Sequence, residues 1–258
     1  MQELSVGYAL ALGLLQGITE WLPISSSGHL VIFHSLLGIP VPPEFDIVIM
    51  AGTIAALILY FRAKILSLLT GLVKGDRQAI RYCFFIVIAG TATALIGFAA
   101  RPFFLTLYAR PFIVSLLLVV TGIFLFIASR PRAAVGDMNA GTALVIGIAQ
   151  GIAVAPGISR SGSTIGAALL LGMKPQEAAE FSFIVGIPTM IAASAITLMD
   201  EPMGGVPPLL LLVAVVAAFV AGYASIGIFM KVFRTNHLDI FAYYCILAGC
   251  LFAVLTFH

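Results

Sequence analysis

Charge is what this sequence has least of. Only 9% of its 258 residues are Asp, Glu, Lys or Arg, whereas soluble domains carry about 25% charged residues. Hydrophobic residues make up 61% of the chain, and the mean hydropathy is +1.14. This composition excludes a soluble globular protein and predicts an all-α polytopic membrane protein. The net charge of +2 is also too small to indicate a nucleic-acid partner.

Cysteine is scarce as well. The three cysteines, Cys83, Cys245 and Cys250, all lie in apolar runs. Their odd number and their spacing argue against a disulfide framework and a cysteine metal site. A basic segment before the first apolar run is also lacking, and Glu3 stands in its place. We therefore expect this run to belong to the mature protein and not to a cleaved signal peptide.

Long apolar runs, in contrast, are abundant. Six of them are close to the roughly 20 residues that a helical membrane span requires. The predicted spans are 45–61, 82–100, 112–128, 179–198, 207–230 and 240–257. Between the first two spans, residues 62–81 are expected to form a basic loop. Residues 101–111 are expected to form a short outer connection between the second and third spans.

Two further apolar stretches, 4–37 and 141–172, are interrupted in the middle. Pro23 and the serines after it break the first, and Pro156-Gly157 breaks the second. Each half of the first stretch has about 15 residues, too few for a span of about 20. Both stretches are therefore predicted to form re-entrant hairpins of two short helices. Such irregular backbone is tolerated at membrane depth only where protein or a wet cavity covers it.

The two hairpins are related in sequence. Residues 16–18 match residues 150–152, an offset of 134 (150 minus 16), and Ser25, Ser27 and Gly28 match Ser159, Ser161 and Gly162. Internal repeats at about 4–128 and 141–257 each hold one hairpin and three spans. Because an odd number of spans inverts the second copy, the sequence predicts an inverted-topology repeat within a single integral membrane domain, residues 1–258. The hairpin tips are expected to meet near the midplane.

The basic residues predict the orientation. Ten of the thirteen Lys and Arg residues fall on one side of the predicted spans. They are Arg62, Lys64, Lys74, Arg77, Arg81, Arg130, Arg132, Lys174, Lys231 and Arg234. The positive-inside rule makes this side cytoplasmic, so both termini are expected to be external.

Polar side chains gather in the first hairpin. Gln16 and Glu20 are four residues apart and share a helix face, and a carboxylate in an apolar helix predicts function. The alternative for Glu20 is a structural hydrogen bond to a neighbouring helix. Ser25, Ser26 and Ser27 could cap the next helix, or, with backbone N–H groups, bind a phosphate. His29, beside these serines, is also expected to be functional.

Arg160 is the matching feature of the second hairpin. It could simply pair with Glu20. Its neighbours Ser159, Ser161 and Thr164 instead favour a phosphate site, because a guanidinium presents a planar fork to phosphate oxygens. Glycines also recur at four-residue spacing in both hairpins, at positions 13, 17, 147 and 151. They are expected to let the two hairpins pack closely together.

These motifs resemble those of a known family. The patterns Gln16-x-x-x-Glu20, Pro23-x-Ser-Ser-Ser-Gly28-His29 and Pro156-Gly-x-Ser-Arg160-Ser-x-x-Thr164 are similar to those of the undecaprenyl-diphosphate phosphatases, which are known for bacitracin resistance. The resemblance covers the whole chain. It implies an integral membrane enzyme that removes one phosphate from undecaprenyl diphosphate and leaves the monophosphate lipid carrier for cell-wall polymers. It also implies a divalent cation, Mg²⁺ or Ca²⁺.

The resemblance and the motifs together give a set of site residues. The residues predicted to act in catalysis are Glu20, Ser26, His29 and Arg160. Those predicted to bind the polyprenyl diphosphate are Gln16, Ser25, Ser27, Ser159, Ser161 and Thr164. Glu20, with Gln16, is predicted to hold the metal, although family members frequently have glutamate where this chain has Gln16. The nucleophile is open between Ser26, with His29 as its acid–base partner, and a water activated by His29 or Glu20.

A transporter or flippase of polyprenyl phosphates is the alternative function, because secondary carriers also use inverted repeats with broken helices. In either case the expected location is the plasma membrane, among membrane lipids. For a phosphatase that recycles diphosphate released during wall synthesis, the site is predicted to open to the external face. The oligomeric state is left open between a monomer and a homodimer.

Overall fold

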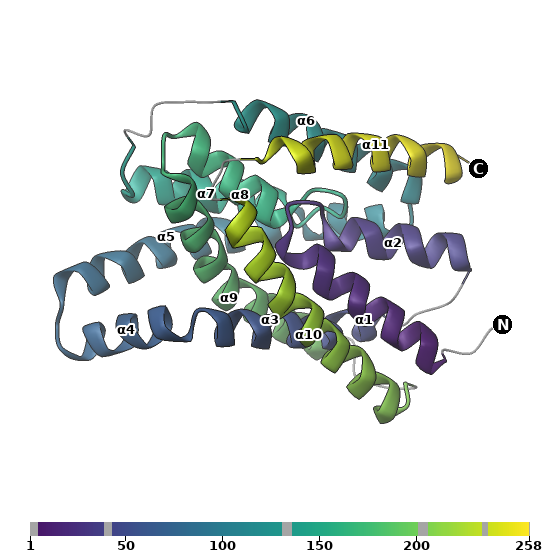
Figure 1. Cartoon of the computed structure of the whole chain (residues 1–258), viewed down its shortest axis with the longest axis horizontal. Coiled ribbons are helices and arrows are strands. Elements are labelled where there is room, and N and C mark those ends of the chain that lie inside the picture. The colour runs from purple at the N-terminus through teal and green to yellow at the C-terminus, as the bar shows by residue number, and fades with distance from the viewer. Residues whose placement is uncertain (1–4, 39–42, 131–135, 201–205, 234–236, 258) are drawn as a thin grey trace.

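The computed structural model describes residues 5–38, 43–130, 136–200, 206–233 and 237–257. Every regular element in these ranges is an α-helix (Figure 1). The first half of the chain contains α1 (Val6–Trp21), α2 (Ser26–Leu37), α3 (Pro43–Tyr60), α4 (Arg62–Val73), α5 (Arg77–Tyr108) and α6 (Pro111–Ala128). The second half contains α7 (Ala140–Ile152), α8 (Arg160–Leu170), α9 (Pro175–Asp200), α10 (Pro208–Val232) and α11 (Asp239–Leu255).

Both broken stretches have the interruption that the sequence predicts. The first breaks between α1 and α2, where Ser25 caps α2 and its hydroxyl accepts a hydrogen bond from the Gly28 N–H. The second breaks between α7 and α8, where Ser159 accepts from the Gly162 N–H at 3.0 Å. Gly157 has a φ of +92° in this break, and a Cβ there would lie 2.4 Å from the Val114 carbonyl oxygen. Only glycine fits that approach.

Several helices are long enough to cross a membrane. Among the described residues, α5, α6, α9 and α10 meet this condition by length and apolar composition, and α3 with α4 forms a fifth candidate that is bent by 71°. The chain therefore has the helices of a multi-pass membrane protein. The last predicted span corresponds to α11, a shorter apolar helix of 17 residues.

Two predicted connections are wrong. Residues 62–81 do not form a loop, because they fold as α4, a turn, and the start of α5. Asp76 caps the N-terminus of α5, and its carboxylate accepts hydrogen bonds from the Gln78 and Ala79 N–H groups. Residues 101–111 are not an outer connection either, because α5 continues through Pro102 to Tyr108. The reason is packing: Phe104 and Leu107 are buried in a small apolar cluster with Ala155. This contact holds the helix beyond the proline.

The glycine spacing works differently from the prediction. A Cβ on Gly13 would lie 2.3 Å from the Ala214 carbonyl oxygen, which places α1 directly on α10. A Cβ on Gly147 would lie 2.4 Å from the Ala89 carbonyl oxygen, which places α7 directly on α5. The small faces thus bring each hairpin against a long helix, and not against the other hairpin.

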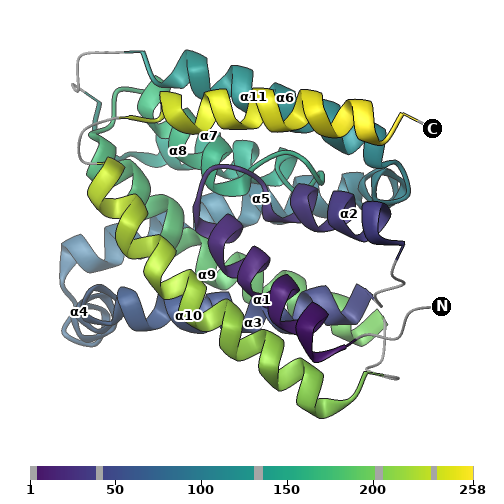
Figure 2. The same ribbon diagram turned by 45° about the vertical axis from the view of Figure 1, so that its right-hand side comes forward.

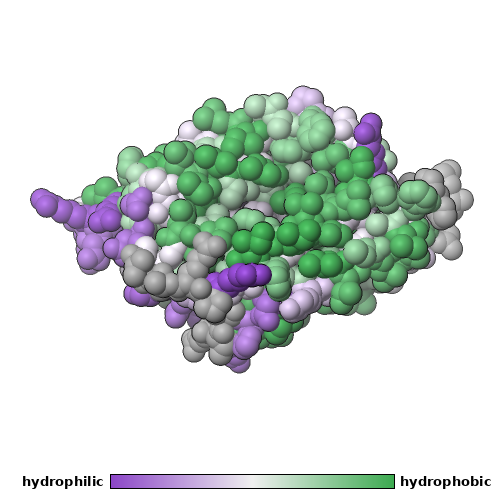
Figure 3. Space-filling view, turned by 90° about the horizontal axis from the view of Figure 1, so that it is seen from above, coloured by the Kyte–Doolittle hydropathy of each residue, from purple (hydrophilic) through white to green (hydrophobic). Residues whose placement is uncertain are grey.

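Apolar side chains fill the centre and also cover the outside. The main buried cluster includes Trp21 and Phe183, whose rings meet edge to face with centroids 5.6 Å apart. Helices α6 and α11 lie side by side in both ribbon views (Figures 1 and 2). A broad hydrophobic surface crosses the face drawn in Figure 3, with hydrophilic residues toward its margins. This distribution suits a protein surrounded by lipid.

Candidate functional site

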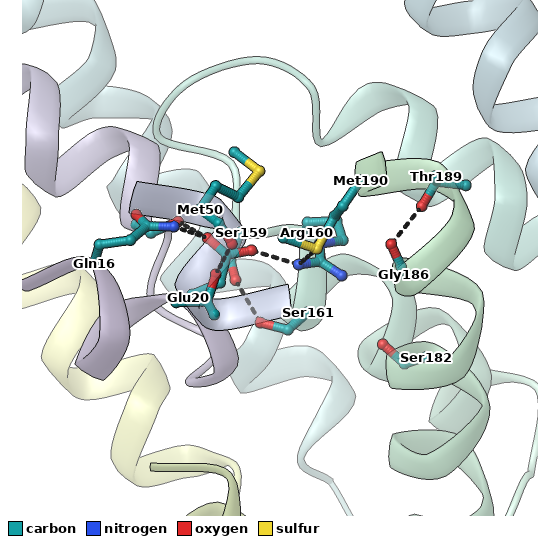
Figure 4. A network of polar contacts seen from close by, with 12 residues as sticks. Gln16, Glu20, Met50, Ser159, Arg160, Ser161, Ser182, Gly186, Thr189 and Met190 are labelled. Carbon is teal, nitrogen blue, oxygen red and sulfur yellow. Dashed lines mark hydrogen bonds and ion pairs between the residues drawn. The ribbon is translucent and has the colours of Figure 1, made fainter. Parts of the chain in front are cut away.

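An ion pair joins the two hairpins. Glu20 lies in the last turn of α1, and Arg160 is the first residue of α8. Nη2 of Arg160 donates to Oε1 of Glu20, and the two side chains are only 15% and 8% exposed. Figure 4 shows both side chains turned toward each other across the broken tips. A charged pair is therefore buried at the point where the hairpins meet.

The other carboxylate oxygen of Glu20 is also bound. Gln16 donates to Oε2 through Nε2 at 3.0 Å, as its position one helical turn earlier predicts. Ser26, the first residue of α2, donates its hydroxyl to the same oxygen at 2.5 Å. The carboxylate thus accepts from a guanidinium, an amide and a hydroxyl. Glu20 is the centre of the whole network.

Arg160 keeps one donor unused. Its Nη2 also reaches the Met190 sulfur at 2.9 Å, and its guanidinium carbon lies 5.2 Å from the centre of the Trp21 ring. Its Nη1 is buried and has no hydrogen-bond partner in the described part of the chain. That nitrogen lies against Gly186, where a Cβ would be 2.1 Å away. A buried guanidinium nitrogen without an acceptor calls for an explanation, and an anionic ligand supplies one.

The hydroxyls of α8 build the second tip. Ser159 caps the helix, and Ser161 donates to the Leu22 carbonyl of the first hairpin at 3.0 Å. Thr164 donates to the Arg160 carbonyl at 2.9 Å and bonds to the Ser182 hydroxyl of α9. These bonds fix the helix that presents Arg160. Substrate binding by Ser159, Ser161 and Thr164 themselves stays a prediction.

His29 faces another helix. Its Nδ1 lies 2.8 Å from the Ser25 carbonyl oxygen, and its Nε2 lies 2.8 Å from the Tyr244 hydroxyl of α11. Both ring nitrogens are therefore engaged, and Ser26 bonds to Glu20 and not to His29. An acid–base partnership of His29 with Ser26 stays a prediction. Ser27, also predicted to bind substrate, is half-buried at the start of α2.

Four residues of the site were not found from the sequence. Trp21 stacks on Arg160, and its position next to Glu20 as the chain's one tryptophan could have drawn attention to it. Gly186, Met190 and Tyr244 belong to no motif. They reach the site only because α9 and α11 pack against the hairpins, which no local pattern reports.

The donor set suits a hard cation that a substrate helps to hold. Within the described residues, no group of three or more His, Cys, Asp or Glu side chains gathers in one place. Glu20 offers one carboxylate, and Gln16 and Ser26 offer neutral oxygens beside it. Mg²⁺ is commonly bound by one or two carboxylates together with substrate phosphates, and Ca²⁺ also takes oxygen ligands. The residues therefore fit a divalent cation bound together with a phosphate-bearing ligand.

The fold and the site define a multi-pass membrane protein whose charged centre is assembled from two broken helical hairpins. The family model described as bacitracin resistance protein BacA matches residues 9–251. The chain belongs to this family. A relative from Syntrophotalea carbinolica, named undecaprenyl-diphosphatase, is 40% identical over 96% of this chain and 98% of its own. A relative of the same name from Methanosphaera stadtmanae is 35% identical over 96% of this chain and 97% of its own length. Another, from Carboxydothermus hydrogenoformans, is 34% identical over 96% of this chain and 96% of its own length.

Proposed function

We propose that the protein is a membrane phosphatase that hydrolyses undecaprenyl diphosphate, or a related polyprenyl diphosphate, to the monophosphate lipid carrier and inorganic phosphate. The names of the relatives support this activity. One observation carries it in this chain: Glu20 binds the Arg160 guanidinium on one oxygen and the Ser26 hydroxyl on the other. An anion-binding group and an activated hydroxyl thus meet at one carboxylate.

Arg160 holds the diphosphate. Its unpaired Nη1 and its Nη2, which donates to Glu20 and Met190 in this structure, can together offer two parallel N–H groups to phosphate oxygens. Backbone N–H groups at the starts of α2 and α8 add further donors, and a helix N-terminus favours negative charge. Positioning and charge neutralisation of this kind carry most of the catalysis in phosphoryl transfer.

Ser26 is the nucleophile that the hydrogen bonds favour. Its Oγ attacks the terminal phosphorus while the proton passes to Glu20, and the bond from that phosphorus to the bridging oxygen breaks. The polyprenyl monophosphate leaves with the electron pair of the broken bond. Water then attacks the phosphoserine, Glu20 returns a proton to Ser26, and inorganic phosphate is released. His29 lies one turn further along α2.

A divalent cation, Mg²⁺ or Ca²⁺, is proposed to take part. Glu20 would hold it, and the Gln16 side-chain oxygen is a neutral second ligand. When bound, such a cation neutralises charge on the phosphate oxygens. Glu20 and Arg160 are in direct contact, so both side chains can reach phosphate oxygens at the same point of the site.

The test is release of inorganic phosphate from a set of prenyl diphosphates by the purified protein in detergent, with and without a chelator. We expect release that depends on the cation. Substrate labelled in its terminal phosphate, quenched in acid, should leave label on the protein, and Ser26→Ala should abolish both label and turnover. Turnover that persists in Ser26→Ala would show that water attacks directly. Absence of phosphate release with every substrate would favour the transporter, which requires vesicles and a lipid-flipping assay.

We also propose the finer topology: six spans and two re-entrant hairpins arranged as an inverted repeat. The matched contacts of α1 with α10 and of α7 with α5 support it. In Figure 1 the start of α1 and the end of α11 lie at one end of the molecule, and the basic turn between α4 and α5 lies at the other. The positive-inside rule makes that turn cytoplasmic.

The site is proposed to open to the external face, where diphosphate is released by wall synthesis. Ser27→Cys, in a background with serine at Cys83, Cys245 and Cys250, tests this. A membrane-impermeant thiol reagent should label intact cells, and substrate should protect the cysteine. Labelling confined to inverted vesicles would contradict an external opening.

A further inference from the structure

The residue before the proposed nucleophile has a strained backbone. Ser25 has φ 64° and ψ 89°, and it is the one non-glycine residue with positive φ in the described ranges. A left-handed conformation of a residue with a Cβ persists only where its surroundings hold it, and such residues cluster at functional sites. Ser26 follows directly, so the direction of its hydroxyl depends on how firmly Ser25 is held.

Four hydrogen bonds hold Ser25, and one of them is much shorter than the others. The Ser25 hydroxyl accepts from the Gly28 N–H at 3.3 Å and donates to the Ile158 carbonyl at 3.4 Å. The Ser25 carbonyl oxygen accepts from the backbone N–H of His29 at 3.2 Å and lies 2.8 Å from Nδ1 of the His29 ring. The first three are long hydrogen bonds, whereas the bond to Nδ1 has ideal length. The hydrogen bond from His29 is therefore the main contact that holds Ser25 in its strained conformation.

The hydrogen bonds assign the tautomer of His29. A carbonyl oxygen only accepts, so the proton between His29 and Ser25 belongs to Nδ1. In the neutral ring Nε2 is then an acceptor, and it lies 2.8 Å from the Tyr244 hydroxyl. Tyr244 therefore donates to Nε2. A chain of two hydrogen bonds runs from Tyr244 through the imidazole to the Ser25 carbonyl.

Helix α11 holds this chain in place by packing. The rings of His29 and Tyr244 stack with centroids 5.7 Å apart and planes at 10°. Phe252, also on α11, meets the His29 ring edge to face at 5.8 Å. The thiol of Cys245 reaches the Pro23 carbonyl oxygen at 3.6 Å. One helix face thus covers the whole first tip.

From these contacts we propose that Tyr244 is a positioning residue for the phosphatase reaction. Its hydroxyl holds the His29 ring by donating to Nε2, His29 holds the Ser25 carbonyl through Nδ1–H, and the strained Ser25 directs the Ser26 hydroxyl toward Glu20. The inference rests on the proposed function for its effect on turnover. Its contact chain rests on the geometry alone.

The consequence is a separation of binding from turnover. Removal of the Tyr244 hydroxyl leaves Nε2 of His29 without a donor, so the ring is held less firmly and can rotate. Ser25 then loses its short hydrogen bond, and Ser26 loses its fixed direction. Arg160 lies on the other hairpin and keeps its hold on the diphosphate. The loss therefore falls on kcat and leaves KM close to the wild-type value.

Tyr244→Phe is the test, and the adjacent tyrosine supplies a matched control. Tyr243 lies on the same helix, and its ring packs on Phe126 with centroids 5.9 Å apart. We expect Tyr244→Phe to lower kcat about tenfold, the scale of one lost hydrogen bond, with KM within about twofold. Tyr243→Phe should retain wild-type turnover. In a His29→Ala background, Tyr244→Phe should cause no further loss, because its effect passes through His29.

A measurement on the imidazole makes the test independent of activity. Nitrogen NMR of histidine-labelled protein, with the His29 signals assigned from His29→Ala, should report a hydrogen-bonded Nε2 acceptor in the wild type and in Tyr243→Phe. In Tyr244→Phe the Nε2 signal should move to the position of a nitrogen without a hydrogen-bond donor. Unchanged kcat, an unchanged Nε2 signal, or an equal loss in the His29→Ala background would each overturn the proposal. If the wild type itself released no phosphate, the proposed function would fail, and the Nε2 signal alone would decide whether Tyr244 holds His29.

Discussion

Gln16 and Gln150 occupy matched positions in the two hairpins, yet their surroundings differ in charge. Gln16 donates to Glu20, which also binds Ser26 and Arg160. Gln150 donates to the hydroxyls of Thr93 at 3.0 Å and Thr189 at 3.2 Å, and its Oε1 is buried without a hydrogen-bond partner in the described part of the chain. The residue at the place of Glu20 in the second hairpin is Val154 (20 plus 134).

The comparison teaches how a repeated motif acquires two roles. The first glutamine belongs to a charged network that faces the proposed substrate. The second ties α7 to α5 and α9 through neutral groups, and Thr189 lies next to Met190, which contacts Arg160. Because a buried charge is costly unless it is paired, only the tip that receives Arg160 can carry a carboxylate. The neutral surroundings of Gln150 hold Thr189, the residue before Met190, and so support the part of α9 that contacts Arg160.

Arg160→Lys should disrupt the charged network around Glu20 most severely. The ammonium keeps the charge but lacks the planar fork that can meet Glu20 and a phosphate together. We expect a loss of about 100-fold or more in kcat/KM, the scale of one preorganised donor in the transition state. Arg77→Lys, an exposed change at the start of α5, is the control and should be neutral. Phosphate release near the wild-type rate in Arg160→Lys would remove the guanidinium from the reaction.

Glu20→Gln should be almost as damaging, with a loss of about 100-fold. The amide keeps the shape but cannot take the Ser26 proton or balance the buried Arg160 charge. Circular dichroism should show the helices retained, and chelator should no longer affect the residual rate. Glu177→Gln, at an exposed pair with Lys174, provides the control. A Glu20→Gln protein with full, cation-dependent turnover would contradict the central place of this carboxylate.

The same substitution at the two glutamines should give opposite results. Gln16→Glu places a second carboxylate beside Glu20, Arg160 and the proposed cation, so turnover should persist and the cation should bind more tightly. Gln150→Glu puts a carboxylate in a site 2% exposed, where it meets only neutral partners. We expect it to lower the free energy of unfolding by about 3 kcal/mol or more. Thermal melts in detergent compare the two, and equal melting temperatures would refute the division between the tips.

The sequence was informative where a motif is local. The break at each tip, the shared face of Gln16 and Glu20, and the closeness of Glu20 to Arg160 follow from spacing and from the repeat. These features need only helical geometry and the rule that a buried charge seeks a partner.

Other features depend on packing between distant helices. Pro102 looked like the end of a helix, but the cluster that buries Phe104 and Leu107 carries α5 past it. The glycine spacing predicted that the hairpin helices pack closely, but not which helices they pack against. Their neighbours are the backbones of α10 and α5, and no sequence pattern identifies these contacts. Tyr244 was missed for the same reason: it stands 215 residues from His29 in the chain.

The smallest expected effect concerns the neutral surroundings of Gln150. Thr189→Val keeps the shape of the side chain but removes the oxygen that accepts from Gln150, while Thr93 still accepts. We expect stability to fall by about 1 kcal/mol, the net worth of one hydrogen bond. Turnover should fall only two- to threefold, because the adjacent Met190 becomes more mobile but still contacts Arg160. Thr197→Val, a half-buried position on the same helix, is the control, since its hydroxyl bonds only within the helix at 3.1 Å. A loss of turnover comparable to that of Arg160→Lys would instead give the surroundings of Gln150 a direct part in the reaction, and the two glutamines would no longer differ in role.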